Sequence, residues 1–197
     1  MCLLLETIRV KDGRYCHLAY HQERMDRSMD AHFPGFKPLN ISVIKIPDNC
    51  SPGIFKCRLL YDTKIRNIEF LPYSIKPIRS IRLVNADNLE YPYKYADRSG
   101  FEQLQKENPD VDEIILIKNG NITDTSYSNL AFLSGHKWFT PSEPLLNGTC
   151  RRRLIHHGVL TPIRISSNDL TKFSHVSLIN AMLDLSDILL PVEAIEI

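Results

Sequence analysis

The first half of the chain consists of short apolar runs separated by turn residues, a pattern typical of β-strands joined by hairpins. Residues 1–10 (MCLLLETIRV) are dense in apolar and β-favouring residues, and Asp12-Gly13 follows as a turn signal. We therefore expect a strand that enters a hairpin. Further apolar runs predict strands at 54–61, 65–71 and 81–84.

One segment of this half has a different period. Residues 18–31 contain no Gly or Pro, and Leu18, Met25 and Met29 recur near helical spacing, so we expect a helix there. Residues 34–53 are rich in proline and predict a loop with one short strand at 41–46.

The second half gives clearer signals. Residues 113–118 (EIILIK) predict a buried strand, and Asn119-Gly120 is a strong signal for a two-residue hairpin turn. The other predicted elements are a helix at 98–107, strands at 130–133, 138–140 and 162–165, a helix at 149–157 ending at Gly158, a short helix at 167–173 capped by Ser166 or Ser167, and an apolar run at 175–183.

Strands and helices interleave here without the regular alternation of a parallel βαβ fold. We therefore predict an α+β protein of two small subdomains with largely antiparallel sheets. Residues 85–93 (NADNLEYPY) hold turn formers and a proline, which is typical of a linker. The expected division is an N-terminal subdomain at 1–86, a linker at 87–93, and a C-terminal subdomain at 94–197.

Composition excludes several classes of protein. The chain has 197 residues with 24 Lys+Arg against 23 Asp+Glu, so its net charge is too small to attract the phosphate backbone of a nucleic acid. No apolar run approaches the roughly 18 residues of a membrane span, and the opening apolar residues meet Glu6 and Arg9 too soon for a signal peptide. Five cysteines without paired spacing indicate reduced thiols, so we expect a cytoplasmic protein.

Lys94 is the first candidate for chemistry, because it stands among tyrosines in Tyr91-Pro92-Tyr93-Lys94-Tyr95. A partly desolvated lysine has a lowered pKa and a nucleophilic amine. The simpler interpretation is a surface lysine whose stem lies along aromatic rings.

Other candidates also have two interpretations each. Arg24 could bind a phosphate or carboxylate, or form an exposed pair on a helix. The turn at 146–151 (LNGTCR) opens a helix and suits an anion, or it is an ordinary helix start. Asp124 is either a buried acid facing a ligand or a residue that caps a turn. His17 and His21 have metal-ligand spacing, but no third ligand is evident and no metal is expected.

The order of these motifs resembles the class IV, fold-type IV pyridoxal-phosphate (PLP) enzymes, which include branched-chain and D-amino-acid aminotransferases and aminodeoxychorismate lyase. The matching stretches are LETIRV with Asp12-Gly13, His21-x-x-Arg24-Met25, Lys94, EIILIKNGNITDTSYSNL at 113–130, Thr140-Pro141 with Leu146-x-Gly148-Thr149-Cys150-Arg151, and Ile179-Asn180-Ala181-Met182. They extend over nearly the whole chain.

This resemblance implies a fold-type IV architecture with the site at the seam of the two subdomains, a homodimer, and PLP as cofactor. Lys94 would form the Schiff base, and Asp124 would face the pyridine nitrogen. The phosphate would be held by a set of cofactor-binding residues, namely Arg24, Thr149, Cys150, Asn180 and Ala181. Arg58 and Thr7 would bind the substrate.

The resemblance also implies two reactions. The lyase passes through a quinonoid and releases pyruvate and p-aminobenzoate from aminodeoxychorismate, and the aminotransferase yields a keto acid. Lys94-x-x-Asp97-Arg98 and Asn180-Ala181-Met182 favour the lyase, whereas Arg58 favours the aminotransferase. Arg58 could instead be a sheet-face residue paired with Asp62 or Glu69.

The chain departs from the family pattern in three ways. Asp124 replaces the usual glutamate, and the aromatic residue after Asn129-Leu130 is displaced, with Ala131 preceding Phe132. The chain also begins and ends close to its first and last motifs. These departures are compatible with a more open site, a different substrate or a loss of activity. A non-catalytic homologue without cofactor is therefore a third interpretation.

Overall fold

The chain folds as two units, and the computed structural model describes residues 2–197. Unit 1 comprises Met1–Ile75 (described from residue 2) and Tyr93–Asp97, and unit 2 comprises Lys76–Pro92 and Arg98–Ile197. The division differs from the predicted one. Residues 76–86 and most of the expected linker belong to unit 2, whereas Lys94 returns to unit 1.

Hydrogen bonding and packing explain this difference. The 87–92 segment is fixed to unit 2, where Asp87 accepts a hydrogen bond from the Asn119 backbone and the Tyr91 ring packs edge-on against Phe101. The next residues pair with β1 (Leu4–Lys11) of unit 1, through the bridge between Leu4 and Tyr95. A turn-rich sequence predicts irregular backbone well, but it does not show which unit that backbone packs on.

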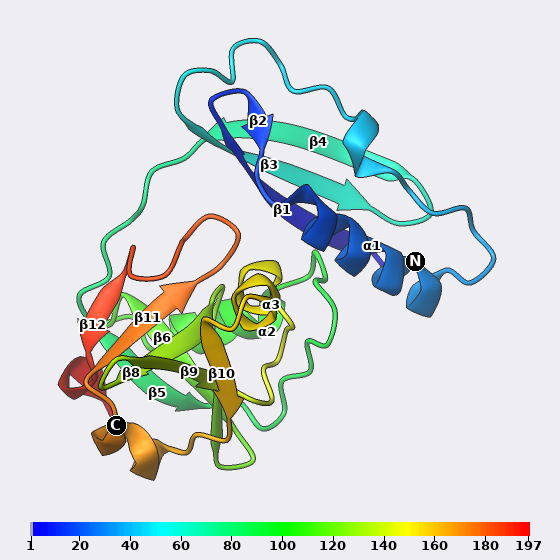
Figure 1. Cartoon of the computed structure of the whole chain (residues 1–197). Coiled ribbons are helices and arrows are strands. Elements are labelled where there is room, and N and C mark those ends of the chain that lie inside the picture. Colours follow the sequence, from blue (N-terminus) through cyan, green and yellow to red (C-terminus); the bar gives the residue numbers. More distant parts are fainter. Residues whose placement is uncertain (1) are drawn as a thin grey trace. The chain divides into compact units, whose positions relative to one another are not determined.

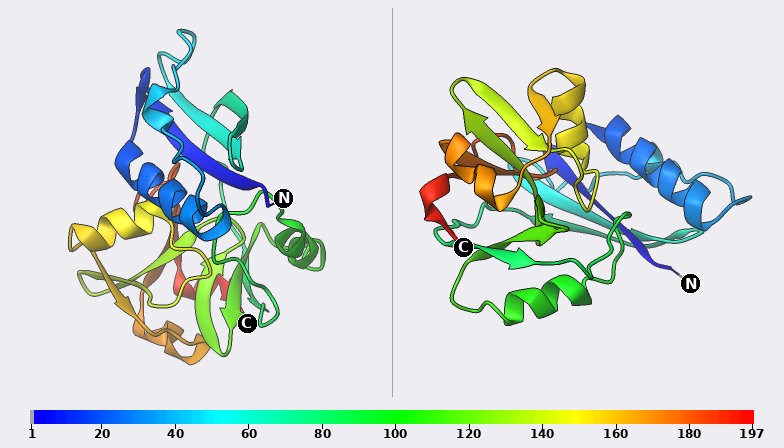
Figure 2. Two further views of the ribbon diagram at one scale, coloured as in Figure 1. Left: turned by 90° about the vertical axis from the view of Figure 1, so that its right-hand side faces the viewer. Right: turned by 90° about the horizontal axis from the view of Figure 1, so that it is seen from below.

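Unit 1 is a four-stranded antiparallel sheet in the order β2–β1–β3–β4, with α1 (Leu18–His32) on one face (Figures 1 and 2). Its other strands are β2 (Arg14–Tyr15), β3 (Ile54–Tyr61) and β4 (Ile65–Pro72). The strand predicted at 1–10 forms at Leu4–Lys11, and residue 1 lies outside the described part of the chain. The strands predicted at 54–61 and 65–71 and the helix at 18–31 are confirmed.

Burial in this sheet alternates as strand geometry requires. Leu4, Ile8 and Val10 are fully buried on one face of β1 and form a core with Met25 and Met29 of α1. Glu6 lies at the same alternating positions and is equally buried, so a carboxylate sits within this hydrophobic layer.

The predicted strand at 41–46 is wrong. The segment forms a 3-10 helix at Ile41–Val43, because the Asn40 side chain accepts hydrogen bonds from the Ser42 backbone N–H at 2.9 Å and from the Ser42 hydroxyl at 2.7 Å. This local cap favours a turn over an extended strand.

Unit 2 is built on a mixed sheet in the order β10–β9–β8–β7–β6–β5–β13, with β11 and β12 branching from β8. The strands are β5 (Ile81–Asn85), β6 (Glu113–Lys118), β7 (Asn121–Thr125), β8 (Asn129–Ser134), β9 (Lys137–Pro141), β10 (Leu160–Ile163), β11 (His175–Ile179), β12 (Leu189–Pro191) and β13 (Ile195–Glu196). Most neighbours are antiparallel, but β5–β6, β5–β13 and β9–β10 are parallel.

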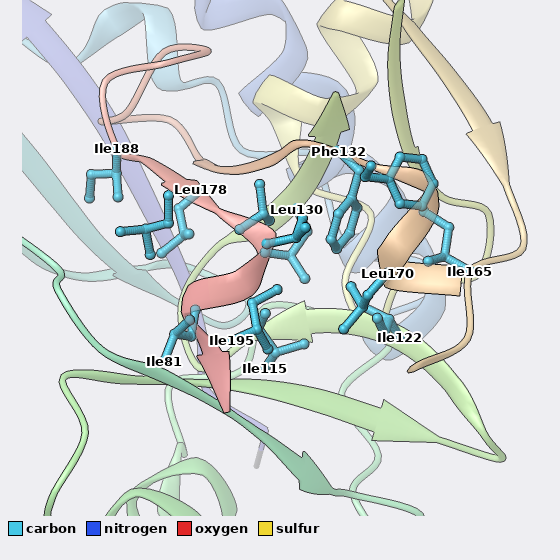
Figure 3. Close-up of a cluster of buried hydrophobic side chains, with 14 of the residues drawn as sticks. Ile81, Ile115, Ile122, Leu130, Phe132, Ile165, Leu170, Leu178, Ile188 and Ile195 are labelled. Atoms are coloured by element: carbon cyan, nitrogen blue, oxygen red, sulfur yellow. The ribbon is translucent and has the colours of Figure 1, made fainter. Parts of the chain in front are cut away.

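Apolar side chains from distant parts of the sequence meet inside unit 2. Figure 3 shows Ile81, Ile115, Leu130 and Leu178 directed toward one another from four different strands, and Ile195 joins them. Burial of such side chains contributes about 1.5–3 kcal/mol each relative to exposure. This core holds β7 and β8, and thereby Asp124, in place.

The helices of unit 2 are α2 (Ser99–Lys106) and α3 (Thr149–His156), with 3-10 helices at Ser167–Lys172 and Val192–Ala194. Gly158 follows α3 with a φ of +69°, as predicted for a glycine just beyond a helix. Ser166, one of the two predicted caps, forms a capping box with Asp169. None of the helices in residues 2–197 is long and apolar enough to span a membrane.

Candidate functional site

Lys94 lies on a short segment that is held against the edge of β1. The Leu5 N–H donates to the Lys94 carbonyl at 2.9 Å, and the Ala96 N–H donates to the Leu3 carbonyl at 2.8 Å. The Tyr95 N–H also donates to the Tyr93 carbonyl at 2.9 Å, so the backbone turns tightly at the lysine. Lys94 is thus half-buried on a backbone fixed on both sides.

The tyrosines around Lys94 in the sequence belong to different units. The rings of Tyr93 and Tyr95 lie 4.5 and 5.6 Å from the ring of His32 in α1. Tyr91 belongs to unit 2 and packs on Phe101. Tyr93 and Tyr95 thus form an aromatic group with His32 in the unit that holds Lys94, and the packing of Tyr91 on Lys94 stays a prediction.

Arg24 and His21 of α1 converge on Glu6. Arg24 donates through Nε to Glu6 Oε1 at 2.8 Å and through Nη2 to Glu6 Oε2 at 2.6 Å, and His21 Nδ1 lies 2.7 Å from Glu6 Oε2. Glu6 is fully buried, and Arg24 and His21 are exposed by only 6% and 2%. Arg24 is thus not the exposed helix residue of the simpler interpretation. A bidentate pair of this kind fixes the guanidinium plane.

The charges of this buried cluster are well defined. Burial alone would raise the pKa of Glu6, but Arg24 and His21 outweigh it and lower the pKa to about 2. Burial lowers the pKa of His21, and although Glu6 raises it, the positive charges of Arg24 and Lys94 oppose that effect. Glu6 is therefore ionised and His21 neutral at pH 7, with its proton on Nδ1 toward the carboxylate.

Sequence reasoning missed the role of Glu6. The signal that could have revealed it is a single acid at an inward-facing position of an otherwise apolar strand, which requires a buried cationic partner. His21 also lacks a metal-ligand partner set, since no group of three His, Cys, Asp or Glu side chains that could hold a metal occurs in residues 2–197.

Arg58 and Thr7 lie directly opposite each other on β3 and β1. Arg58 Nη1 is 3.2 Å from Glu69 Oε2 on β4, in a half-exposed ion pair. The sheet-face interpretation is thus confirmed with Glu69 as partner, while Asp62 pairs with Arg66 instead. The role of Arg58 and Thr7 in binding a substrate stays a prediction.

Asp124 is buried at the end of β7 in unit 2. Its Oδ1 accepts from the Asn129 side-chain amide at 2.7 Å, and its Oδ2 accepts from the Leu146 N–H at 2.8 Å. Burial raises the pKa of Asp124 to about 7, although these donors and the nearby charge of Arg151 act in the opposite direction. Asp124 is therefore both a turn-holding residue and an acid that titrates near neutral pH.

The turn before α3 packs closely on Asn129. Gly148 is the N-cap residue, and a Cβ there would lie 2.0 Å from Asn129 Oδ1, so a side chain does not fit. Thr149 and Cys150 follow as the first helical residues, and both are buried. Backbone N–H groups in the first turn of a helix have no partner within the helix, so this turn suits an anion.

The Asn180-Ala181 turn lies in the same unit. Asn180 Oδ1 accepts from the backbone N–H groups of Met182 at 2.7 Å and Leu183 at 3.0 Å, and its Nδ2 donates to Ser128 Oγ at 2.9 Å. The Cys150 Sγ contacts the Leu183 carbonyl at 3.8 Å. The Asn180 side chain therefore fastens this turn to Ser128, just before β8, and the Cys150 contact joins the turn to the start of α3.

The predicted site residues fall into two groups. Unit 1 holds Arg24, which is bonded to Glu6 beside His21, and Lys94, whose charge acts on His21, with Thr7 and Arg58 on the same sheet. Unit 2 brings Asp124, Thr149, Cys150, Asn180 and Ala181 together through Asn129, Gly148 and Ser128.

Comparison with known proteins supports the family. The sequence model of the family "Amino-transferase class IV" matches residues 62–190. The chain belongs to this family. An uncharacterized protein of Haemophilus influenzae is 35% identical over 182 residues, which cover 91% of this chain and 97% of that protein. The family and the fold-type IV architecture expected from the motifs are confirmed.

Solved structures of class IV proteins show the same fold. One, provisionally named a 4-amino-4-deoxychorismate lyase, from Haemophilus somnus, has a TM-score of 0.84 and 29% identity, over 94% of this chain and 98% of that chain. An aminotransferase from Brucella abortus bound to PLP has a TM-score of 0.72 at 17% identity, over 96% of this chain and 79% of that one. The second likeness shows the fold alone.

Proposed function

We propose that this class IV family member is a PLP-dependent lyase that acts on aminodeoxychorismate. The observation that carries the proposal is the likeness to the Haemophilus somnus protein, whose provisional name is that of the lyase and which matches nearly the whole length of both chains. The motifs around Lys94 and Asn180 favour the same reaction.

The residues of the chain fit PLP chemically. An aldehyde requires an amine, and Lys94 offers one on a backbone fixed to β1. A phosphate requires hydrogen-bond donors in fixed positions. The Arg24 guanidinium, held by Glu6, offers such donors. The turn at Gly148, where there is no room for a Cβ, offers backbone N–H groups. A pyridine nitrogen requires an acid, and Asp124 is buried and titrates near neutrality.

When bound, PLP supplies an aldehyde for the substrate amine and a ring that accepts charge from the substrate carbon. The chain supplies the proton transfers. Lys94 Nζ is the base that removes a proton from the substrate carbon, and its fixed backbone limits where that amine reaches. Asp124 holds a proton at the ring nitrogen, since a cationic neighbour lowers the pKa of a buried acid and keeps it ionised. Aspartate in place of glutamate is compatible with this role.

An aminotransferase is the second candidate, and one observation favours it. Arg58 lies on the sheet of unit 1 opposite Thr7, where it would bind a substrate carboxylate. The Brucella abortus protein of the same fold is named an aminotransferase. The two candidates share every step up to the loss of the substrate proton and differ in the bond that changes next.

Two further proposals concern the setting of the enzyme. We place it in the cytoplasm, since none of the cysteines in residues 2–197 forms a disulfide. We also propose a homodimer, on the basis of the family resemblance. Light scattering of the purified protein gives the mass directly, and a monomer at micromolar concentration would contradict the second proposal.

The decisive experiment combines a spectrum with a product assay. The purified protein is expected to show the visible band of lysine-linked PLP, and borohydride should attach the cofactor to Lys94 in a peptide map. Lys94→Ala should lose the band, whereas Lys64→Ala, at an exposed lysine of the same unit, should keep it. A wild-type protein without the band would overturn the proposal.

The reaction is then assigned from products. Aminodeoxychorismate should yield p-aminobenzoate and pyruvate in equal amounts with wild-type protein and none with Lys94→Ala. Keto acid from branched-chain or D-amino acids, without p-aminobenzoate, would assign the aminotransferase instead.

A further inference from the structure

Three aromatic rings of unit 1 pack together around the residues that flank Lys94. The centre of the His32 ring lies 4.5 Å from that of Tyr93 and 5.6 Å from that of Tyr95, with interplanar angles of 74° and 70°. The rings of Tyr93 and Tyr95 are 6.1 Å apart at 68°. All three pairs are edge-on, an arrangement in which the positive edge of one ring meets the negative face of the other. The orientation of each ring therefore depends on the other two.

The segment that carries Lys94 has few other attachments within unit 1. It consists of Tyr93–Asp97 alone, and the residues before and after it belong to unit 2. Backbone hydrogen bonds with Leu3 and Leu5 hold it along one edge. A backbone that turns at Lys94 and is held along one edge can still rotate about that edge. The ring contacts on both sides of the lysine supply the second attachment that prevents this rotation.

His32 is a fixed point for this attachment. It is the last residue of α1, and Met25 and Met29 of the same helix are buried in the core of unit 1. The next residue, Phe33, donates its N–H to the Met29 carbonyl at 2.7 Å and so closes the last turn. The Tyr95 hydroxyl lies 3.5 Å from His32 Nε2, at the outer limit of a hydrogen bond. Ring packing is thus the main contact between His32 and the tyrosines.

The direction of the Lys94 side chain matters for the reaction with an aldehyde. The unprotonated Nζ adds to the aldehyde carbon, and the two amine protons leave with the aldehyde oxygen as water. A misplacement of about 1 Å between reacting groups can slow a reaction about 100-fold. We propose that His32 is a positioning residue for Lys94. It holds the rings of Tyr93 and Tyr95, and thereby sets the direction in which the lysine amine extends.

This inference rests on the proposed role of Lys94 in binding PLP, and it adds a residue that lies outside the motifs resembling the family. His32→Ala removes the ring. The visible band should then form about 10- to 100-fold more slowly after PLP is mixed with the protein, and borohydride trapping at Lys94 should slow by the same factor. His32→Phe keeps a ring in place and should restore the wild-type rate. Asp30→Ala is the control, because Asp30 is an exposed residue of the same helix.

A second ligand separates positioning from general damage to the fold. Pyridoxine 5′-phosphate has the ring and phosphate of PLP but a hydroxymethyl group in place of the aldehyde, so it cannot react with the lysine. Calorimetry should show that His32→Ala binds it as tightly as wild type, because the proposed ring and phosphate contacts do not include His32. A structural defect would instead weaken this binding and slow the PLP reaction together.

A further variant keeps the test informative if His32→Ala does not fold. His32→Leu fills most of the space of the histidine but offers no aromatic ring, so it should show the same slow reaction with unchanged pyridoxine 5′-phosphate binding. Circular dichroism establishes that each variant is folded.

The outcomes distinguish the two proposals. If wild-type protein forms the band and the folded His32 variants form it as fast as Asp30→Ala, the positioning role is wrong and PLP binding at Lys94 stands. The positioning role is equally wrong if pyridoxine 5′-phosphate binding falls by the same factor as the rate. If wild-type protein forms no band, the proposed function is wrong and the positioning role with it.

Discussion

Glu6 in unit 1 and Asp124 in unit 2 are both buried carboxylates, and their pKa values move in opposite directions. Arg24 and His21 meet Glu6 at hydrogen-bond distance and bring its pKa to about 2. Asp124 meets the neutral donors of Asn129 and Leu146 at that distance, and burial raises its pKa to about 7.

This difference separates a completed charge cluster from an incomplete one. The charge of Glu6 is matched within its own unit, so Glu6 positions Arg24 and takes part in no proton transfer. Within the described part of unit 2, the nearby cation Arg151 bonds instead to Thr140, Asn147 and the Pro141 carbonyl, so no ion pair there matches the charge of Asp124. An acid in that condition suits a positively charged group that arrives with a ligand, as the proposed cofactor would.

The substitution with the largest expected effect on the contrast between Glu6 and Asp124 is Glu6→Gln. It leaves the Arg24 guanidinium buried without its counter-ion, which should lower the free energy of unfolding by about 3–5 kcal/mol. Urea unfolding measures this loss. A protein with Glu6→Gln that unfolds at the wild-type urea concentration would show that Glu6 does not hold the cluster.

Acid titration examines the same group without a substitution. A lowered folded-state pKa gives stability that is present above the unfolded value of 4.5 and is lost as the pH falls toward about 2. For a buried group, that shift corresponds to about 3 kcal/mol. The difference between wild type and Glu6→Gln should therefore shrink over this range.

Asp124 should show the opposite pH dependence. Because its folded-state pKa of about 7 lies above the unfolded value of 3.8, it favours folding below pH 3.8 and loses that contribution as the pH rises through 7. The loss is on the order of 4 kcal/mol in protein without cofactor. Thermal unfolding from pH 5 to 8 should show a steeper decline for wild type than for Asp124→Asn.

Cofactor loading sharpens this prediction. A cationic ring nitrogen beside Asp124 should lower its pKa and abolish the decline in the loaded protein. An equally steep decline with and without PLP would contradict the assignment of Asp124 to the ring nitrogen.

Gly148→Ala should disturb the environment of Asp124 by a smaller amount. The added Cβ would meet Asn129 Oδ1 at 2.0 Å, and the φ of −66° at Gly148 suits alanine, so the effect is steric alone. We expect a loss of about 1–3 kcal/mol in unfolding free energy and weaker PLP binding. Gly100→Ala is the control, because its Cβ would meet only the movable end of Leu89.

The smallest expected effect is at Glu69. Its ion pair with Arg58 is half-exposed, so Glu69→Gln should change the unfolding free energy by about 0–1 kcal/mol. Urea unfolding beside Glu6→Gln thus compares an exposed and a buried acid on the same sheet. A loss as large as that of Glu6→Gln would show that burial does not control the difference.

Local patterns in the sequence predict much of the fold. Hairpins marked by Asp12-Gly13 and Asn119-Gly120 form where expected, because both pairs supply positive φ values. The missed strands β12 and β13 are short. β13 pairs with Ile81, more than a hundred residues earlier, and no local pattern encodes such a pairing. The strand predicted at 162–165 forms at Leu160–Ile163, since Ile165 instead accepts the Ile122 N–H through its carbonyl.

The candidate site is predictable to a different extent. Family motifs identify Lys94, Arg24 and Asp124 by position. They do not reveal that Glu6 accepts hydrogen bonds from the Arg24 guanidinium or that Asn129 links Asp124 to Gly148. These contacts depend on the tertiary structure and not on local spacing. Sequence spacing identifies the candidate side chains, and their tertiary contacts determine which of them are charged.

The return of residues 93–97 to the edge of β1 has a consequence for biosynthesis. A ribosome releases Leu4 and Leu5 long before their pairing partners, so this end of β1 has an open edge until residue 97 has emerged. By then the nascent chain has already made β5, whose neighbour β6 does not yet exist. Completion of the first sheet and display of its lysine are thus delayed until nearly half of the polypeptide has been synthesised.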